Sequence, residues 1–340
     1  MNLYIFPEAA CLNNGYGIGV DFGYKKLNPG AEDLVIWYTI LDKKDMMYVE
    51  DHHIIFKKNR TFSFKSFKNI LTGKERTECC YSDLSFLKGM KFDHIHCDEV
   101  IFYRAIRKLF PKQQLSLRLH NCFSRIYDRK RMLNMRLDWK YEIKLRNMYK
   151  LEQEIFQDPQ VYKIFISDED RAYYLANFGR YCDSESWLYI PDMAAAKRNR
   201  EATYRYTHKL VWFGGIESHK KASVEWFINH VFKHIREDIP DVEFHLWGRG
   251  SSNFDDPNNH VFGHGFWKGT DMPMHNALYV NPDIIGGGIK LKLLTFIENG
   301  IPVISTPFGF EGYTKELIDN TFCIVEENQN WANRIISIIK

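Results

Sequence analysis

Short apolar runs alternate with longer amphipathic runs along most of the chain. Such alternation predicts parallel strands joined by helical crossovers. The stretch from Ser124 to Phe156 contains neither Gly nor Pro, which predicts one or two helices. A further helix is expected at Asp168–Phe178, with Ser167 as its N-cap and Gly179 closing it. The strands expected in this half are Leu3–Phe6, Leu34–Ile40, His94–Cys97, Leu115–Leu119 and Lys163–Ile166.

A second alternating series follows a stretch, 191–208, that has little apolar periodicity and is interpreted as a linker. The pattern therefore predicts two doubly wound, Rossmann-like α/β domains, 1–190 and 209–340, facing a central cleft. Ligands of such sheets bind outside the carboxyl ends of the strands. The second series has expected strands at Leu210–Phe213, Val242–Leu246, Ala277–Val280, Pro302–Ser305 and Thr321–Val325, and expected helices at Val224–Glu237, Lys290–Glu298, Thr314–Ile318 and Trp331–Ile339.

Composition supports a two-domain globular protein. The chain has 340 residues, of which 45% are hydrophobic and 26% charged. No segment approaches the roughly 20 apolar residues that span a bilayer, and Met1 to Phe6 lacks the basic start of a signal peptide. The seven cysteines show no CxxC spacing, which is typical of reduced thiols. We therefore expect a cytoplasmic protein.

The net charge of +3 is unevenly divided. Residues 1–200 carry 33 Lys and Arg against 26 Asp and Glu, whereas residues 201–340 carry 13 against 17. The basic excess lies in Lys57–Arg76, which is interleaved with phenylalanines, and in Arg125–Lys150. A basic face implies an anionic partner, although solvated helix faces explain the same pattern. An anionic membrane surface fits these stretches better than nucleic acid, because no nucleic-acid module is recognisable.

Three consecutive glycines, Gly286 to Gly288, stand just before an expected helix, followed by Ile289 and Lys290. Backbone N–H groups at a helix start attract anions, and glycine lets a phosphate approach closely. A lysine in the first turn is unfavourable for the helix dipole, which argues for an anionic ligand there. The alternative is a plain glycine turn between a strand and a helix.

The segment from Pro282 to Gly312 resembles the donor-site signature of glycosyltransferase family 4. Its parts are the loop Gly286–Lys290, the strand Gly300-Ile-Pro-Val-Ile-Ser-Thr306 and the turn Glu311-Gly312. The resemblance extends to Gly214-Gly215 with Lys220-Lys221, and to Gly248-Arg249-Gly250. In the first half, Arg118-Leu-His120-Asn121 and Glu154 resemble family segments. Asn13 to Gly19 stands where the family has a glycine-rich loop.

This resemblance implies a two-Rossmann fold of the GT-B type and a retaining glycosyl transfer without a metal. The co-substrate would be a nucleoside diphosphate sugar bound by the C-terminal domain, with no other cofactor. Lys220 or Lys221 and Lys290 would neutralise the leaving diphosphate, and His120 would act on the acceptor side. The implied donor-binding positions are Gly15, Gly17, Gly214, Gly215, Lys221, Arg249, Gly286, Gly287, Gly288, Ile289, Thr295, Glu298 and Glu311.

The chain departs from the family at two positions. Family members commonly carry two glutamates eight positions apart, which align here with Gly287 and Thr295. In the family, the second of these glutamates typically contacts the nucleotide ribose. Here Thr295, or Glu298 one helical turn further on, could make that contact. The departure also raises the alternative of a non-catalytic partner subunit; a nucleotide-sugar epimerase is a third possibility. We expect transfer to a saccharide or lipid-linked acceptor in surface polysaccharide synthesis, such as capsule, O-antigen or exopolysaccharide, possibly at the inner face of the membrane.

One acidic motif and one histidine motif have the residue types of a metal site. Asp168-Glu169-Asp170 follows a serine cap, where acids suit the helix dipole. His94 and His96 share one face of an expected strand without a complete set of ligands. We therefore expect no metal site.

Overall fold

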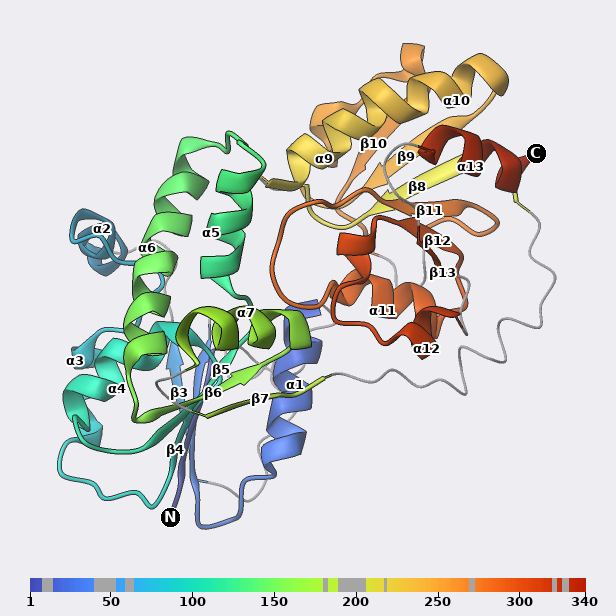
Figure 1. Ribbon diagram of the computed structural model, residues 1–340. Helices are drawn as coiled ribbons and strands as arrows, with labels where there is room; N and C mark the ends of the chain where they lie inside the picture. The colour runs from blue at the N-terminus through green and yellow to red at the C-terminus, as the bar shows by residue number, and fades with distance from the viewer. Residues whose placement is uncertain are drawn as a thin grey trace. The chain divides into compact units, whose positions relative to one another are not determined.

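The chain forms two compact units, Met1–Tyr189 and Ile190–Lys340, each of which is described by itself (Figure 1). The computed structural model describes residues 1–7, 15–39, 53–58, 64–179, 183–188, 206–216, 219–268, 273–319, 323–325 and 330–340. Most of the expected linker, 191–205, lies outside the described residues.

The first unit is built on a seven-stranded sheet with the order β3-β2-β1-β4-β5-β6-β7, in which every pair is parallel. The doubly wound arrangement predicted from the sequence is confirmed. Neither β3 nor β7 was expected, because β3 begins and ends with polar residues and β7 contains none that is apolar. The strands are β1 (Leu3–Phe6), β2 (Leu34–Thr39), β3 (His53–Lys58), β4 (Ile95–Cys97), β5 (Leu115–Leu119), β6 (Val161–Phe165) and β7 (Ser184–Ser186).

The stretch expected to hold one or two helices forms two, α5 and α6. Asn134 between them takes a left-handed φ of 49°, and Asp138 caps α6 by accepting from the N–H groups of Lys140 and Tyr141. Ser167 caps α7 as predicted. The helices of this unit are α1 (Gly15–Leu27), α2 (Phe64–Leu71), α3 (Tyr81–Leu84), α4 (Tyr103–Leu109), α5 (Phe123–Met132), α6 (Trp139–Gln157) and α7 (Asp168–Phe178), with 3₁₀ turns η2 (Ser85–Leu87) and η3 (Val100–Phe102).

The second unit has a six-stranded parallel sheet with the order β10-β9-β8-β11-β12-β13. Its five expected strands form within one or two residues of the predicted bounds. The edge strand β10 was missed because its five residues include two glycines. The strands are β8 (Lys209–Phe213), β9 (Glu243–Trp247), β10 (Val261–Gly265), β11 (Leu278–Asn281), β12 (Val303–Ser305) and β13 (Cys323–Val325).

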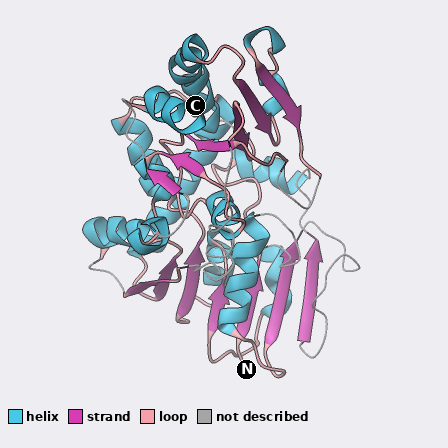
Figure 2. Ribbon diagram, turned by 90° about the vertical axis from the view of Figure 1, so that its right-hand side faces the viewer, coloured by secondary structure: helices cyan, strands magenta, loops and turns pink. Residues whose placement is uncertain are grey.

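Helices cover both faces of this second sheet (Figure 2). Trp212 and Phe244 pack with Phe227 and Trp331 on the face that carries α9, α10 and α13. Tyr279 packs on Phe296 of α11 at the opposite face. The helices are α9 (His219–Phe227), the π-helical turn η4 (Ile228–Phe232), α10 (Lys233–Asp238), α11 (Leu291–Glu298), α12 (Lys315–Asp319) and α13 (Trp331–Ile339), with 3₁₀ turns η5 (Ser251–Phe254), η6 (Pro257–Asn259) and η7 (Pro307–Phe310).

One predicted helix start was wrong by several residues, and another was wrong by one. The helix expected at Val224 begins at His219 and is interrupted by the π-helical turn. The helix expected at Lys290 begins at Leu291. Among the described residues, no helix combines the length and apolar character needed to cross a bilayer.

Candidate donor and acceptor sites

Four turns meet at the carboxyl edge of the second sheet, because its strands are parallel and β9, β8, β11 and β12 are successive neighbours. Gly214 follows β8, Gly248 follows β9, Pro282 follows β11, and Thr306 follows β12. This is the edge at which ligands of doubly wound sheets bind. It collects most of the donor-site positions predicted from the sequence.

The turns after β8 and β9 pack backbone against backbone. The Gly214 N–H donates to the Trp247 carbonyl at 2.9 Å, and both Gly214 and Gly248 have left-handed φ values, 127° and 129°. A Cβ on Gly248 would collide with the Gly214 carbonyl oxygen, so only glycine fits there. Apart from its chain neighbours, no described residue lies within 4 Å of the Cβ position of Gly215. The glycines therefore keep two turns close together.

Side-chain hydrogen bonds join the turns after β11 and β12. Asn281 Nδ2 donates to Ser305 Oγ at 2.8 Å, and Ser305 Oγ donates to the Asn281 carbonyl at 3.2 Å. Thr306 Oγ1 donates to the carbonyl of Asp283 and accepts from the Gly309 N–H. All four polar side chains are buried. Ser305 and Thr306, which carried part of the family resemblance, thus hold the neighbouring turn in place.

The triple-glycine turn runs from that scaffold into α11. Gly286 and Gly288 have φ values of 155° and 59°, and the second of these lies in the left-handed region. Both are buried, whereas Gly287 is half-buried. Ile289 is buried, and Lys290 occupies the N-cap position rather than the first turn of α11 as expected. The lysine in the first turn is Lys292.

Lys292 is the main site residue that sequence reasoning missed. Its Nζ lies 3.1 Å from Asp283 Oδ2 and 3.7 Å from the centroid of the Trp212 ring. Its side chain is only 12% exposed. The Lys290 Nζ donates to the Gly288 carbonyl at 3.1 Å and lies 3.8 Å from the Phe308 ring. Both ammonium groups thus stand beside the glycine turn.

Two other lysines act electrostatically on Lys292. Burial lowers the pKa of Lys292 to about 8, from the usual value near 10.5. Asp283 opposes this decrease, whereas the positive charges of Lys220 and Lys290 add to it. Among the charged groups that act on Lys292, one carboxylate is thus set against two further cations. A diphosphate bound there would supply the negative charge that this cluster of Lys220, Lys290 and Lys292 lacks.

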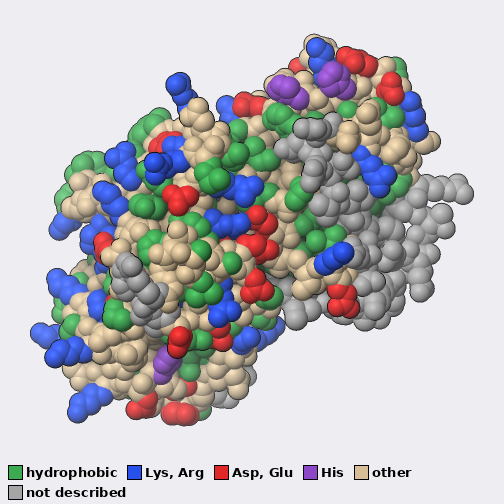
Figure 3. All heavy atoms as spheres, viewed as in Figure 1, with side chains coloured by type: hydrophobic (Ala, Val, Ile, Leu, Met, Phe, Trp, Pro, Cys, Tyr) green, Lys and Arg blue, Asp and Glu red, His purple; other side chains and the backbone are tan. Residues whose placement is uncertain are grey.

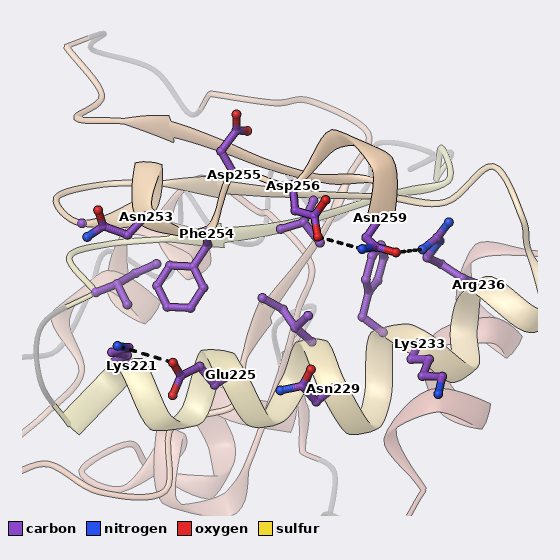
Figure 4. A pocket seen from close by; sticks show the side chains of 15 residues that line it. Lys221, Glu225, Asn229, Lys233, Arg236, Asn253, Phe254, Asp255, Asp256 and Asn259 are labelled. Atoms are coloured by element: carbon purple, nitrogen blue, oxygen red, sulfur yellow. Dashed lines mark hydrogen bonds and ion pairs between the residues drawn. The ribbon is translucent and has the colours of Figure 1, made fainter.

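Lys221, next to Lys220, has a different partner. Its Nζ is 3.5 Å from Glu225 Oε1, and its side chain lines a cavity of about 700 Å³ between α9 and α10 on one side and residues 250–261 on the other (Figure 4). The cavity mixes acids, bases and amides, with Asp256, Asn259 and Arg236 bonded to one another. Of the two adjacent lysines, Lys220 is therefore the one that acts electrostatically on Lys292.

The other candidates of the second domain lie on several of its elements. Arg249 is exposed, and its carbonyl accepts from the Ile216 N–H at 2.8 Å. Thr295 and Glu298 are half-buried on α11, and Glu311 is half-buried after η7. Gly312 beside Glu311 has a φ of 88°. The structure places all of these near strand ends or on the helix that follows the glycine turn.

The first unit carries a buried ionic cluster at the carboxyl ends of β4 and β5. His120 Nε2 lies 3.0 Å from the Asp98 carbonyl and 3.2 Å from its Oδ2. Arg118 Nη1 donates to Asp98 Oδ1 at 3.1 Å and to the Gly19 carbonyl at 2.7 Å. Burial opposes ionisation of Asp98, yet Arg118, followed by His120, keeps its pKa well below the usual range. Asp98 is thus an anion that orients His120, which is only 6% exposed.

The family resemblance implied that Gly15 and Gly17 lie in a loop. In the structure they lie in the first turn of α1. Asn13 and Asn14 lie outside the described residues. Because α1 follows β1, its start is at the same sheet edge as His120. The bond from Arg118 to Gly19 joins α1 to β5.

Two glutamates of α6 have different partners. Glu154, which carried part of the family resemblance, is half-exposed and binds Arg104 through both carboxylate oxygens, at 2.6 and 2.8 Å. Glu152 is buried and accepts from the backbone of Phe123 and Ser124 at the start of α5. Glu152 therefore fixes the helix that begins three residues after His120.

The histidine motif and the acidic motif that have the residue types of a metal site make hydrogen bonds and ion pairs within the protein. His94 Nε2 and His96 Nδ1 both bond to Ser116 Oγ, at 2.8 and 2.7 Å, and burial lowers the pKa of both histidines. Asp170 pairs with Arg125 at 3.0 Å. In the part of the chain that the structure describes, no group of three His, Cys, Asp or Glu side chains could hold a metal ion.

The pKa of Lys292 leads to a testable pH dependence. Lys292 is charged below pH 8 and loses its proton above it, so affinity for a nucleoside diphosphate should fall by up to about tenfold per pH unit above 8. Isothermal titration between pH 7 and 9.5 measures this fall, and a Lys292→Met variant should not show it. Affinity that stays constant over this range in the unmodified protein would contradict the role of Lys292.

Comparison with known proteins agrees with this geometry. Residues 207–340 match the family described as glycosyl transferases group 1. No curated protein matches the sequence. The structure resembles WaaG, a glycosyltransferase involved in lipopolysaccharide biosynthesis, with 10% identity and a TM-score of 0.58, covering 100% of this chain and 90% of WaaG.

Two further structures have the same architecture. Sucrose-phosphate synthase from Thermosynechococcus elongatus is 13% identical with a TM-score of 0.59, covering 99% of this chain and 89% of that one. The trehalose 6-phosphate synthase from Burkholderia multivorans is 9% identical with a TM-score of 0.53, covering 95% and 87%. The chain therefore has the fold of the GT-B glycosyltransferases, two parallel-sheet Rossmann-like domains, and its second domain matches the group 1 glycosyl transferases.

Proposed function

We propose that this protein is a family 4 glycosyltransferase that transfers a sugar from a nucleoside diphosphate sugar with retention of configuration. The observation that carries the proposal is the cluster of Lys220, Lys290 and Lys292 beside a glycine turn at the carboxyl edge of the second sheet. Backbone N–H groups of a glycine turn and fixed cations are the groups that bind two linked phosphates.

The proposed chemistry needs no metal. Breaking the bond between the sugar and the diphosphate builds negative charge on the departing phosphate, and fixed cations aimed at that charge stabilise the transition state. Lys290 and Lys292 would supply these cations from the start of α11, and Lys220 would supply a third. In a retaining transfer of this kind, the leaving phosphate takes the proton from the acceptor hydroxyl, so no carboxylate nucleophile is required.

We assign the acceptor side to the first unit. His120, oriented by Asp98, stands at the carboxyl end of β5, where it could hydrogen-bond the transferred sugar or assist proton movement. The proposed acceptor is a saccharide or a lipid-linked saccharide of surface polysaccharide synthesis. The enzyme would act in the cytoplasm as a peripheral protein on the inner, anionic membrane face.

The ribose contact is assigned to α11, although the usual glutamate is replaced by Thr295. Either the Thr295 hydroxyl or Glu298, three residues further along the helix, should bind the ribose. Thr295→Ala or Glu298→Ala should weaken nucleotide binding by about tenfold, the effect of one lost hydrogen bond to a ligand. Titration calorimetry measures both variants, with Glu316→Ala on α12 as a control. Unchanged affinity in both variants would remove both assignments.

A second candidate, a non-catalytic partner subunit, is favoured by one observation, the threonine at position 295. The two candidates differ in what happens after binding. A thermal-shift screen against UDP, GDP, ADP and CMP identifies the nucleotide, because a bound ligand raises the melting temperature. Incubation with sugar nucleotides of that base should then release the nucleoside diphosphate. Binding without release or transfer would favour the partner subunit, and no binding of any nucleotide would refute the donor site.

A further inference from the structure

Helix α2 exposes its apolar side chains and buries two polar ones, Ser66 and Asn69. Phe64 and Leu71 are 84% and 70% exposed, and Phe67 and Ile70 are also exposed. Ser66 and Asn69 face inward, where Asn69 Nδ2 donates to the Glu78 carbonyl at 3.0 Å. Burial of apolar surface normally drives the opposite orientation. A contiguous apolar helix face left in water indicates a surface that an apolar phase or partner covers.

A second exposed apolar group lies where α5 and α6 meet. Met132 is 86% exposed and Trp139 is 68% exposed, and Leu133 and Ile143 are exposed beside them. These residues come from the end of α5, the connecting turn and the first turns of α6. Tryptophan is enriched where a protein meets the boundary between lipid and water. The exposed side chains at this end are therefore of the kind that enter a lipid headgroup region.

One stripe of α6 connects the two groups. Asn147 Nδ2 donates to the Lys74 carbonyl at 3.0 Å, just after α2, so this side of α6 faces the α2 segment. Ile143 and Lys140 lie four and seven residues before Asn147 and share its face of the helix. They lead from the α2 contact toward Trp139. The two apolar groups therefore belong to one side of the first unit.

Exposed basic side chains accompany both groups. Lys68 is exposed on α2, and hydrophobic and basic side chains lie over α2 and over the end where α5 and α6 meet (Figure 3). The three acids near that end have partners, since Asp138 caps α6, Glu142 pairs with Lys130 and Asp128 accepts from the Tyr173 hydroxyl. The exposed basic residues of this end are Arg131, Arg136, Lys140, Lys144 and Arg146.

We propose that the outward face of α2 and the α5–α6 end form one docking surface for an anionic lipid bilayer. The apolar side chains would insert at the level of the headgroups, and the basic residues would contact the lipid phosphates. The positive charge of this surface favours an anionic lipid bilayer as its partner. It disfavours a second copy of this chain, because two such basic surfaces repel each other. The inference rests on the proposed function only in assigning a lipid-linked acceptor to that membrane.

The test is sedimentation of the full chain with vesicles, without nucleotide. The protein should bind phosphatidylcholine vesicles that contain phosphatidylglycerol, less in high salt, and bind pure phosphatidylcholine weakly. Neutralising Arg131, Arg136 and Lys140 with glutamine should weaken binding by about 100-fold, since each charge near the surface contributes about fivefold. Lys112→Gln, an exposed lysine before β5, is the charge control and should bind normally.

Two apolar variants test insertion. Serine at Phe64, Phe67 and Leu71, or at Met132, Leu133 and Trp139, should each weaken vesicle binding by about tenfold or more. Leu175→Ser on α7 is the matched control because Leu175 is also exposed. Trp139 fluorescence, taken as the difference from Trp139→Phe, should shift to shorter wavelength with vesicles. Melting temperatures show whether each variant is folded; if an apolar variant is not, the charge variant and Trp139 decide.

Three outcomes would overturn the proposal. They are no binding to anionic vesicles in low salt, folded apolar and charge variants that bind like the unmodified protein, or a dimer in light scattering that the α2 variant dissociates. The nucleotide screen is independent of these results. A protein that binds a nucleotide but no vesicle refutes only the docking surface, whereas vesicle binding without nucleotide binding refutes only the proposed function.

Discussion

Replacing Lys292 with methionine should lower kcat/KM for donor turnover by about 100-fold or more, the loss typical when one fixed group at a developing oxyanion is removed. Methionine fills similar space beside Trp212 but lacks the charge that lies 3.1 Å from Asp283. The largest part of the loss should appear in kcat, because negative charge on the leaving phosphate grows in the transition state. Initial rates of nucleoside diphosphate release measure the effect.

Stability must be separated from catalysis in that experiment. Lys292→Met leaves the buried carboxylate of Asp283 without its cation, which costs about 3–5 kcal/mol when a buried pair is broken on one side. Asp283→Asn in the same chain should restore much of the melting temperature without restoring turnover. Lys315→Met, an exposed lysine on α12, is the charge control. Full activity in a folded double variant would show that Lys292 only balances Asp283.

Replacing Asp98 with asparagine should lower kcat by about 100-fold, within the range that general acid–base and positioning effects contribute. Asparagine keeps the size of the side chain but removes the anion that holds His120 Nε2 at 3.2 Å. Asp98 acts through His120 and is a positioning residue, so the donor KM should stay nearly constant.

The matched variant is His120→Gln. If Asp98 acts through His120, the double variant should be no slower than His120→Gln alone. A merely structural role predicts instead that the losses multiply. Arg118 would remain bonded to the Gly19 carbonyl, and melting temperatures of all three variants monitor the cost of leaving its buried charge unpaired.

Much of the fold could be predicted from local patterns. The central strands, such as β1, β5 and β8, are continuous apolar runs, and buried parallel strands require that composition on both faces. Ser167 and α7 follow from capping chemistry that acts within three residues. The edge strands β3, β7 and β10 could not be predicted in this way, because backbone hydrogen bonds to a single neighbour hold them and polar residues or glycines shorten or replace their apolar runs.

Only part of the candidate site, likewise, could be predicted from local sequence. The glycine turn and Lys290 are visible in the sequence because their chemistry is contained in one short segment. Lys292 was passed over, since nothing local shows that its side chain turns inward to Asp283, nine residues earlier. Lys220 could be chosen over Lys221 only after folding, because two adjacent positions on a helix start point to different sides.

The sequence by itself determined the central strands, several of the helices, that there are two sheets, and where a triple-glycine turn stands. Tertiary structure decided that Asp98 holds His120, that the Lys292 ammonium lies beside Asp283, and that α2 turns its phenylalanines outward. The physical reason is range. Hydrophobic periodicity, caps and glycine turns act over a few residues, whereas ion pairs and exposed faces depend on which strand ends and helices the completed sheet brings side by side.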